Sequence, residues 1–442
     1  MRILTVTILF LSTSILLHAE GFEVSAPLTL QECLVYARDH SPRNAQSRFN
    51  HEQRRIAMQN SALQFLPYVS ASTNANLNFG RGIDPETNTY GTKKTLGSSF
   101  GLSMSLPLFD GLVNINNYKM NKSYLRESEN SAKMYADEVS LSVIKAFYNV
   151  IYYKELLQQV TQMLDADREN LRQTRRQLEL GIKSKADVDE IAATVAEDEY
   201  TLVNQQNLLD EALLTLKSVM WWPPEQELHV YDKLELPETA NILIDNANLH
   251  ELPQAKIAAE QLQQRKLALR IARGNFVPGL SLSAGVSTSY NRTLNMNYRT
   301  LPFHRQFTDN MGEYISTGIS FPIFGRLSKY NNLRSSKLSY KIQQSMYDET
   351  MRSLHTEKQR LRMNLEGAQK EYFSAVSRLT AVESAHTANR RKYELGNISA
   401  LELSTSSVRL AQARATLTGK QIQLLIQKMQ YDYYNGKPYI RE

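Results

Sequence analysis

The chain has 442 residues, 42% of them hydrophobic, and a formal net charge of +6. A chain of this length can bury one large core or several smaller ones. Its low mean hydropathy excludes a protein built mainly of membrane-spanning helices, because after the N-terminus no apolar run approaches the roughly 20 residues that such a helix needs.

The distribution of charge and cysteine sets two further limits. Lysine and arginine are interspersed with aspartate and glutamate along amphipathic segments, which favours solvated helix surfaces over nucleic-acid binding. The single cysteine, Cys33, has no intrachain disulfide partner. Its neighbours Leu30, Leu34 and Ala37 predict a helix, so we expect Cys33 to be a small core residue rather than a reactive thiol.

Residues 1–19 resemble a secretory signal peptide. Arg2 precedes an apolar run from Ile3 to Leu17, and Ala19 follows two positions later. Leu17 is larger than the small residue usually found three positions before the cleavage site, so the sequence does not fix where cleavage occurs. We expect an exported chain whose mature form begins near residue 20.

Residues 20–234 are predicted to form a first structural repeat. Helical character over residues 28–65 is broken only at Ser41-Pro42. Two runs with strictly alternating apolar and small polar residues then predict a β-hairpin over residues 67–109, with residues 80–97 as its polar loop.

The second part of this repeat is predicted to be a helical hairpin. Residues 111–180 contain no proline and no internal glycine, which would give a helix about 105 Å long. Its apolar residues follow the spacing of a coiled coil. A return helix is expected over residues 187–219, where a strict heptad continues, and the adjacent prolines at 223 and 224 end it. Residues 220–246 are expected to form a small lateral region.

A glycine and a capping pattern mark the turn between these helices. Gly181 follows the long helix, and Ser184 is followed three positions later by Asp187, which is the pattern of a capping box. The same pattern returns 215 residues further on as Gly396, Ser399 and Glu402. Both places predict tight turns between antiparallel helices.

The whole plan repeats, which indicates an internally duplicated chain. The second repeat, residues 235–434, is predicted to contain a helix over 247–275, a hairpin over 278–324, a long helix over 326–395 and a return helix over 402–434. An aromatic loop over residues 291–312 joins the two strands of the hairpin. Residues 435–442 are assigned to the lateral region.

Four long strands with one apolar face suit an outer-membrane barrel but cannot close one. A membrane-spanning sheet must leave no open edge, and about eight strands is the practical minimum. Several chains are therefore expected to contribute to one barrel. Each long helix also needs a partner of equal length, which two shorter helices stacked end to end would supply.

The chain resembles the TolC-like outer-membrane efflux proteins in three features. These are the two hairpin-to-helix units, their junctions Leu-Pro-Leu-Phe-Asp-Gly (106–111) and Phe-Pro-Ile-Phe-Gly (321–325), and the twin Glu-Leu-Gly turns. The resemblance covers residues 27–435. It implies an α+β membrane protein that forms a homotrimer, with four transmembrane strands per chain in a 12-stranded barrel and a helical coiled-coil tunnel in the periplasm of a Gram-negative cell.

The resemblance also implies partners and a function. The family exports small molecules, metal ions or proteins, as in type I secretion, when a periplasmic adaptor protein and an inner-membrane pump of the RND or ABC type dock with it. No cofactor is expected, and outer-membrane lipid is the other expected partner.

The family places the paired turns at the periplasmic tip, where the tunnel closes and the adaptor docks. Carried over to this chain, the adaptor-contacting residues would be Leu180, Gly181, Ser184, Leu395, Gly396 and Ser399. The periplasmic gate would be Asp187, Glu402 and Tyr393. The other interpretation is that these glycines, serines and acids only cap helices.

Two departures set this chain apart from better-known relatives. Thr405 stands where some of them have a second gate acid, and Ile398 stands where they have an arginine. At the opposite end, Tyr90, Tyr298, Phe303 and Phe307 would constrict the extracellular mouth. The alternative is that these rings lie at the level of the lipid headgroups.

Enzyme chemistry finds no support in the sequence. The eight histidines lack metal-ligand spacing, and no phosphate-binding glycine loop or nucleophile elbow occurs. The 13 methionines do not cluster and are interpreted as core residues. A non-conducting exported coiled-coil spacer or adhesin is the alternative function, although a spacer has no need for four strands with one apolar face.

Overall fold

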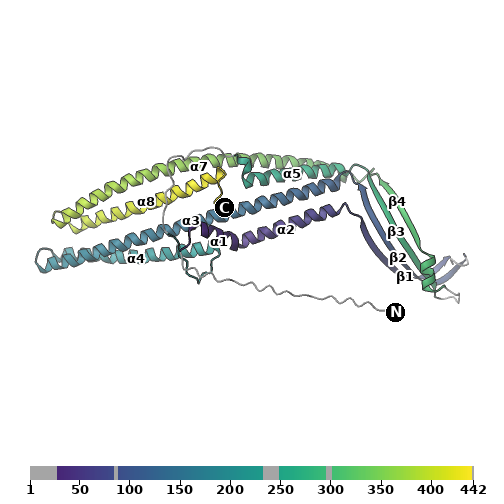
Figure 1. Cartoon of the computed structure of the whole chain (residues 1–442), viewed down its shortest axis with the longest axis horizontal. Helices are drawn as coiled ribbons and strands as arrows, with labels where there is room; N and C mark the ends of the chain where they lie inside the picture. The colour runs from purple at the N-terminus through teal and green to yellow at the C-terminus, as the bar shows by residue number, and fades with distance from the viewer. Residues whose placement is uncertain (1–26, 84–87, 232–247, 295–300, 441–442) are drawn as a thin grey trace.

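The computed structural model describes residues 27–83, 88–231, 248–294 and 301–440. It has an elongated body of long helices that carries a four-stranded β-sheet at one end (Figure 1). The predicted signal peptide, residues 1–19, lies outside the described residues, as do residues 232–246 and 441–442 of the predicted lateral region.

Two helices of equal length organise the body. They are α3 (Val113–Glu179) and α7 (Ser328–Glu394), each of 67 residues, or about 100 Å. Neither contains a proline, and Gly367 does not interrupt α7. The shorter helices are α1 (Leu30–His40), α2 (Pro42–Leu63), α4 (Lys185–Met220), η1 (Leu249–Glu251), α5 (Pro253–Gly274) and α8 (Ala400–Tyr434).

The short helices pack end to end along the long ones. The helices α2 and α4 follow one another beside α3, and α5 and α8 follow one another beside α7. This confirms the pairing predicted from helix lengths. The body therefore consists of α2, α3, α5 and α7 near the sheet and of α3, α4, α7 and α8 at the far end (Figure 1).

The sheet is antiparallel with the strand order β1-β2-β3-β4. Its strands are β1 (Tyr68–Ile83), β2 (Tyr90–Phe109), β3 (Gly279–Thr293) and β4 (Gly312–Ser320). Among the described residues, β1 and β4 each have a strand on one side only, so both edges of the sheet are open.

The register separates the sheet into two chemically different faces. Val69 pairs with Met104, and Ala284 pairs with both Met104 and Ile315, so that apolar side chains meet across all four strands. The residues between them form the other face, where Ser70 pairs with Ser103. The predicted alternation of an apolar face with a small polar face is present in the fold.

Three details of the hairpins differ from the prediction. Residues 80–83 and 90–97, predicted as loop, instead continue β1 and β2. Backbone pairing runs unbroken to the pair Ile83 and Tyr90, and it does not require alternating side chains. The predicted aromatic loop contains a short helix, α6 (Phe303–Asp309). The strand β4 ends at Ser320 because Pro322 has no N–H to donate to the ladder.

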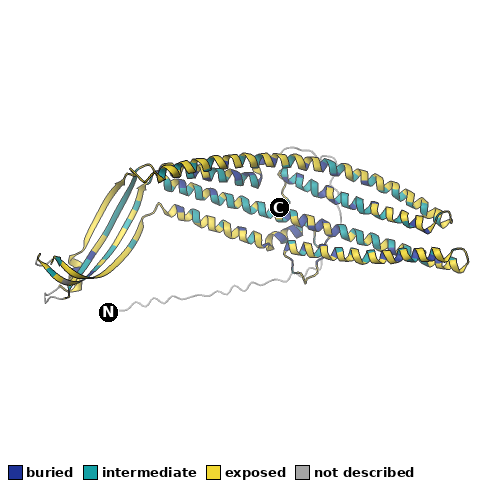
Figure 2. Ribbon diagram, turned by 180° about the vertical axis from the view of Figure 1, so that it is seen from behind, coloured by how far each residue is buried: buried dark blue, intermediate teal, exposed yellow. Residues whose placement is uncertain are grey.

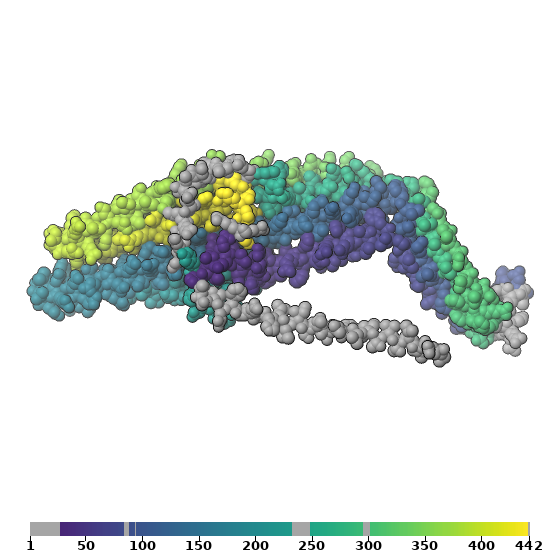
Figure 3. Space-filling view, viewed as in Figure 1, coloured from purple at the N-terminus to yellow at the C-terminus, as the bar shows by residue number. Residues whose placement is uncertain are grey.

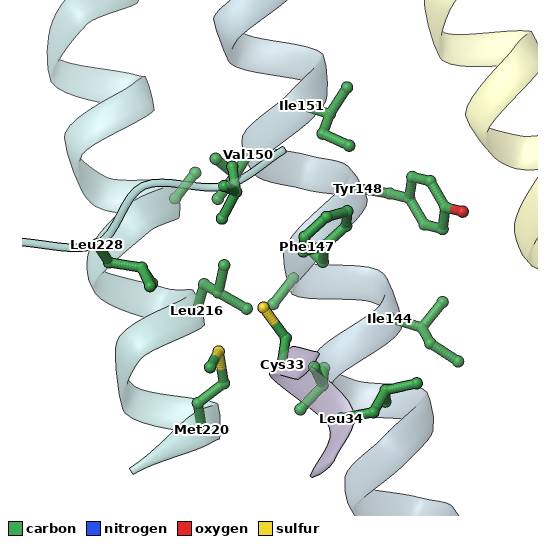
Figure 4. Close-up of a cluster of buried hydrophobic side chains, with 14 of the residues drawn as sticks. Cys33, Leu34, Ile144, Phe147, Tyr148, Val150, Ile151, Leu216, Met220 and Leu228 are labelled. Carbon is green, nitrogen blue, oxygen red and sulfur yellow. The ribbon is translucent and has the colours of Figure 1, made fainter. Parts of the chain in front are cut away.

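The largest core lies midway along the body, where α1, α3, α4 and α8 meet. Figure 4 shows Cys33 pointing between Leu216 and Phe147, and the Cys33 side chain is fully buried. Burial raises the pKa of its thiol to about 12, which confirms the prediction of a core cysteine. Figure 2 shows that buried residues are concentrated in the helices, while most of the sheet is exposed in the single chain.

Within the described part of the chain, no helix contains a stretch long and apolar enough to cross a membrane.

Two glycines fix the crossing where α5 ends and α3 begins. A Cβ built on Gly111 would lie 2.3 Å from the carbonyl oxygen of Gly274, and Gly111 itself has φ +71°. A side chain at either position would push the two backbones apart. This contact joins the two repeats directly beneath the sheet.

Candidate functional site at the helical tip

The two Glu-Leu-Gly turns lie together at the end of the body opposite the sheet (Figure 1). Gly181 and Gly396 have φ of +74° and +75°. After each glycine, the next N–H donates to a carbonyl of the last helical turn, Ile182 to Gln177 and Asn397 to Lys392, both at 2.8 Å. These are Schellman motifs, which need a residue that tolerates a left-handed backbone.

The turns expose apolar side chains at their apex. Leu180 is 73% exposed and Leu395 is 75% exposed. Both side chains are thus largely uncovered in the single chain.

The two capping patterns differ in the structure. Ser184 and Asp187 form a complete capping box, in which the Asp187 carboxylate accepts from the Ser184 N–H at 2.9 Å. At the second turn Ser399 Oγ accepts from the Glu402 N–H at 3.2 Å, but the Glu402 carboxylate makes no return bond. The predicted second box is therefore only half formed, and the Glu402 side chain is exposed.

This difference separates the two predicted gate acids. Hydrogen bonds from the side chain and backbone of Ser184 hold the pKa of Asp187 below its usual value. Asp187 is thus an ionised capping residue whose Oδ2 already accepts two hydrogen bonds from Ser184. Glu402 leaves its carboxylate exposed to the surroundings.

Tyr393 connects the two helical hairpins. Its ring lies 4.9 Å from the Lys183 ammonium of the first turn, a cation–π contact. Its hydroxyl lies 3.4 Å from Oγ1 of Thr174 on α3, which is long for a hydrogen bond between oxygens. The contact of the ring with Lys183 therefore contributes more to holding the two hairpins together than the contact of the hydroxyl with Thr174 does.

A groove of about 550 Å³ runs between α3 and α7 beside these contacts. Gln173, Lys183 and Tyr393 line it together with Leu395 and Gly396. In the space-filling view the hairpin of α3 and α4 lies beside that of α7 and α8 toward this end (Figure 3). Two of the predicted adaptor-contacting residues thus share one groove with the predicted gate tyrosine.

A pair of carboxyl groups, one buried and one half-buried, lies further from the tip. Asp198 on α4 is 4% exposed. Its Oδ2 is buried and has no hydrogen-bond partner among the described residues. Burial, and then the neighbouring carboxyl of Asp167 on α3, raise the pKa of Asp198 to about 7. Asp198 therefore retains its proton to a higher pH than an ordinary aspartate does.

Asp167 also faces the second hairpin. It favours the charged form of His386 on α7, but burial and the nearby Arg390 and Arg414 outweigh it and lower the pKa of this histidine. The ring Nδ1 lies 3.3 Å from Ser406 Oγ on α8. Within the described residues, no group of three or more histidine, cysteine, aspartate or glutamate side chains is placed to hold a metal ion.

Three of the four predicted mouth residues, Tyr90, Phe303 and Phe307, lie in the described part of the chain, at the end of the sheet far from the long helices. Phe303 and Phe307 of α6 pack against Phe100 at ring distances of 5.9 and 5.6 Å. Phe100 belongs to the apolar face of the sheet. Tyr90 begins β2, and Tyr298 lies outside the described residues. The packing of α6 favours the headgroup-level interpretation for the two phenylalanines.

Sequence reasoning missed the partners of Tyr393 and the carboxyl pair. Lys183, Thr174 and Asp198 are ordinary polar residues of a turn and two helices. Their contacts join segments that are far apart in the chain, so no local spacing could have predicted them.

Comparisons with known proteins agree with this geometry. The family model described as outer membrane efflux protein matches residues 34–220 and 246–430. No curated protein sequence matches the chain significantly.

Solved outer-membrane channels share the fold at low sequence identity. The structure of CusC is 14% identical with a TM-score of 0.79, covering 92% of this chain and 91% of that one. VceC from Vibrio cholerae is 14% identical with a TM-score of 0.78, covering 93% and 96%. The open state of MtrE from Neisseria gonorrhoeae is 16% identical with a TM-score of 0.67, covering 93% and 89%. Since the family model covers most of its length, the chain belongs to the outer membrane efflux protein family, whose members are TolC-like channels of the Gram-negative outer membrane.

Proposed function

We propose that three copies of the chain form one export channel, with a 12-stranded barrel in the outer membrane and a helical tunnel in the periplasm. The observation that carries this proposal is the sheet, which has one apolar face and two open edges at β1 and β4. Open edges are not stable in a lipid bilayer. Joining β4 of one copy to β1 of the next would close the sheet.

In this assembly the tip would be both the docking surface and the gate. Three copies would bring six turns together around one opening. The exposed Leu180 and Leu395 would contact the helices of a periplasmic adaptor, supported by Gly181, Ser184, Gly396 and Ser399. Their high exposure in the single chain supports this role.

The three predicted gate residues would each have a different role. Tyr393 would hold the second hairpin against Lys183 of the first turn, and release of this contact would widen the tip. Glu402, with its carboxylate unengaged, would repel its copies in the other chains and attract cations. Asp187 would keep the first turn in shape through its capping box.

The channel would be passive, and an inner-membrane pump of the RND or ABC type would supply the energy through the adaptor. The cargo class would be small molecules, metal ions or proteins, according to the pump. Phe303 and Phe307 would anchor the sheet at the lipid headgroups.

Single-channel conductance in planar bilayers tests this function. Glu402→Ala should raise conductance or open time more than Asp187→Ala. The first variant removes a free carboxylate from the gate, whereas the second removes a carboxylate that is engaged in a helix cap. Thr405→Ala, an exposed residue one turn further along α8, is the control. Absence of conductance from wild type and all variants would refute the channel, whereas unchanged conductance in both acid variants would refute the gate alone.

A further inference from the structure

The helix ends next to the sheet are strongly basic. The ten residues nearest the sheet in α2, α3, α5 and α7 (54–63, 113–122, 265–274 and 328–337) contain eleven lysines and arginines and no aspartate or glutamate. The whole chain has 51 basic and 45 acidic residues. The excess of positive charge is therefore concentrated at one level of the body.

Five of these bases lie within two helical turns, or about 10 Å, of the helix ends that face the sheet. We call Lys119, Arg270, Arg273, Lys329 and Arg334 the basic collar. All are exposed except Lys329, which is half-buried and donates to the carbonyl oxygen of Asn275 at 2.9 Å. Among the described residues, none of the five forms an ion pair with a carboxylate, so their charge is available to a partner.

A ring of exposed apolar side chains separates the basic collar from the sheet. Phe65 and Phe276 are 45% and 44% exposed, while Ile323 and Phe324 are 93% and 79% exposed. The acid in these junctions, Asp110, already accepts a hydrogen bond from the Asn114 N–H at 2.7 Å. The order from the sheet is thus apolar face, apolar ring and basic collar.

This order matches the chemistry of a membrane surface. Apolar side chains favour the hydrocarbon boundary, and lysine and arginine just beyond it favour anionic headgroups. A water-filled lumen would leave Ile323 and Phe324 hydrated at a cost, so it accounts for the bases but not for the apolar ring. The two rings together favour lipid over an anionic cargo.

We propose that the basic collar binds the phosphate groups of anionic glycerophospholipids in the leaflet that faces the helices. The inference rests on the proposed insertion of the sheet into the membrane. Each base that reaches a headgroup should add about fivefold to the preference for anionic lipid.

Lipid retention by the detergent-solubilised full-length protein tests this. Native mass spectrometry would count bound phosphatidylglycerol against phosphatidylcholine with the same acyl chains. Wild type should retain phosphatidylglycerol preferentially. The triple variant Arg270→Gln, Arg273→Gln, Arg334→Gln should lose most of that preference, and so should wild type in 1 M salt, where screening shortens to about 3 Å.

The matched control is Arg175→Gln, Arg176→Gln, Arg391→Gln, which removes three exposed arginines at the tip. This control should keep the lipid preference. An equal loss in both triple variants would overturn the inference, since net charge and not position would then be responsible. A collar variant with unchanged lipid preference but altered ion selectivity in bilayers would place the bases in the lumen and overturn it as well, while leaving the channel itself intact.

Discussion

At the scale of single residues, three carboxyl groups near the tip have different environments and so different roles. The Asp187 carboxylate is ionised and accepts hydrogen bonds from Ser184. The Glu402 carboxylate is exposed and makes no bond to Ser399, and Asp198 is buried beside Asp167. Their sequence contexts on amphipathic helices are similar. Burial and hydrogen bonding decide the chemistry of each one.

Asp198 should make stability depend on pH. Its pKa is raised in the folded chain to about 7, so the folded state binds a proton that the unfolded state releases between about pH 4 and pH 7. The stabilisation is complete below pH 4 and is lost as the pH rises through 7, with a total of up to about 4 kcal/mol.

Asp198→Asn removes this titration and should raise the melting temperature at pH 8 more than at pH 5. The exposed Asp189 on the same helix provides the control, since Asp189→Asn should change the two temperatures alike. Equal shifts at both pH values for Asp198→Asn would show that folding does not raise the pKa of Asp198.

Tyr393 allows its ring to be tested apart from its hydroxyl. Tyr393→Phe keeps the ring over Lys183 and should leave single-channel conductance close to that of wild type. Tyr393→Ala removes the cation–π contact, worth about 0.5–1 kcal/mol, and should increase open time, as should Lys183→Gln. A Phe variant that opens as readily as the Ala variant would assign the latch to the hydroxyl and Thr174 instead.

At the scale of elements, the crossing of α3 and α5 depends on the absence of two side chains. Gly111→Ala combines a left-handed backbone with a Cβ 2.3 Å from the Gly274 carbonyl oxygen. The expected loss of stability is about 2–4 kcal/mol, measured as a lower melting temperature.

Gly181→Ala is the matched control for this crossing. Gly181 has a similar φ of +74°, but no atom lies within 4 Å of its added Cβ. Only the backbone cost of about 1–2 kcal/mol should remain. Equal losses in the two variants would show that backbone conformation alone, and not the crossing, requires Gly111.

The elements also show what the sequence could predict. The helices were predictable because α3 and α7 lack proline and keep regular apolar spacing, and the turns because glycine stands where the backbone is left-handed. The strand ends were not, since residues 80–83 and 90–97 pair through the backbone without an alternating pattern. The turns of the candidate site were predictable for the same local reason. The contacts of Tyr393 and Asp198 were not, because they join different helices.

At the scale of the whole molecule, the chain is chemically incomplete by itself. Among the described residues, the sheet has two unpaired edges and an apolar face that α6 covers only in part. The helices bury their core, but the two turns and the junction beside the sheet leave large apolar side chains exposed. A trimer in a membrane would cover the edges, the apolar face and the junction together.

The mass of the detergent-solubilised protein tests the central claim most directly. Size-exclusion chromatography with light scattering, corrected for bound detergent, should give three chains per particle, and the particle should separate into single chains only on heating in denaturant. A stable monomer or dimer under the same conditions would contradict the account, because four or eight strands per particle could not make the proposed 12-stranded barrel.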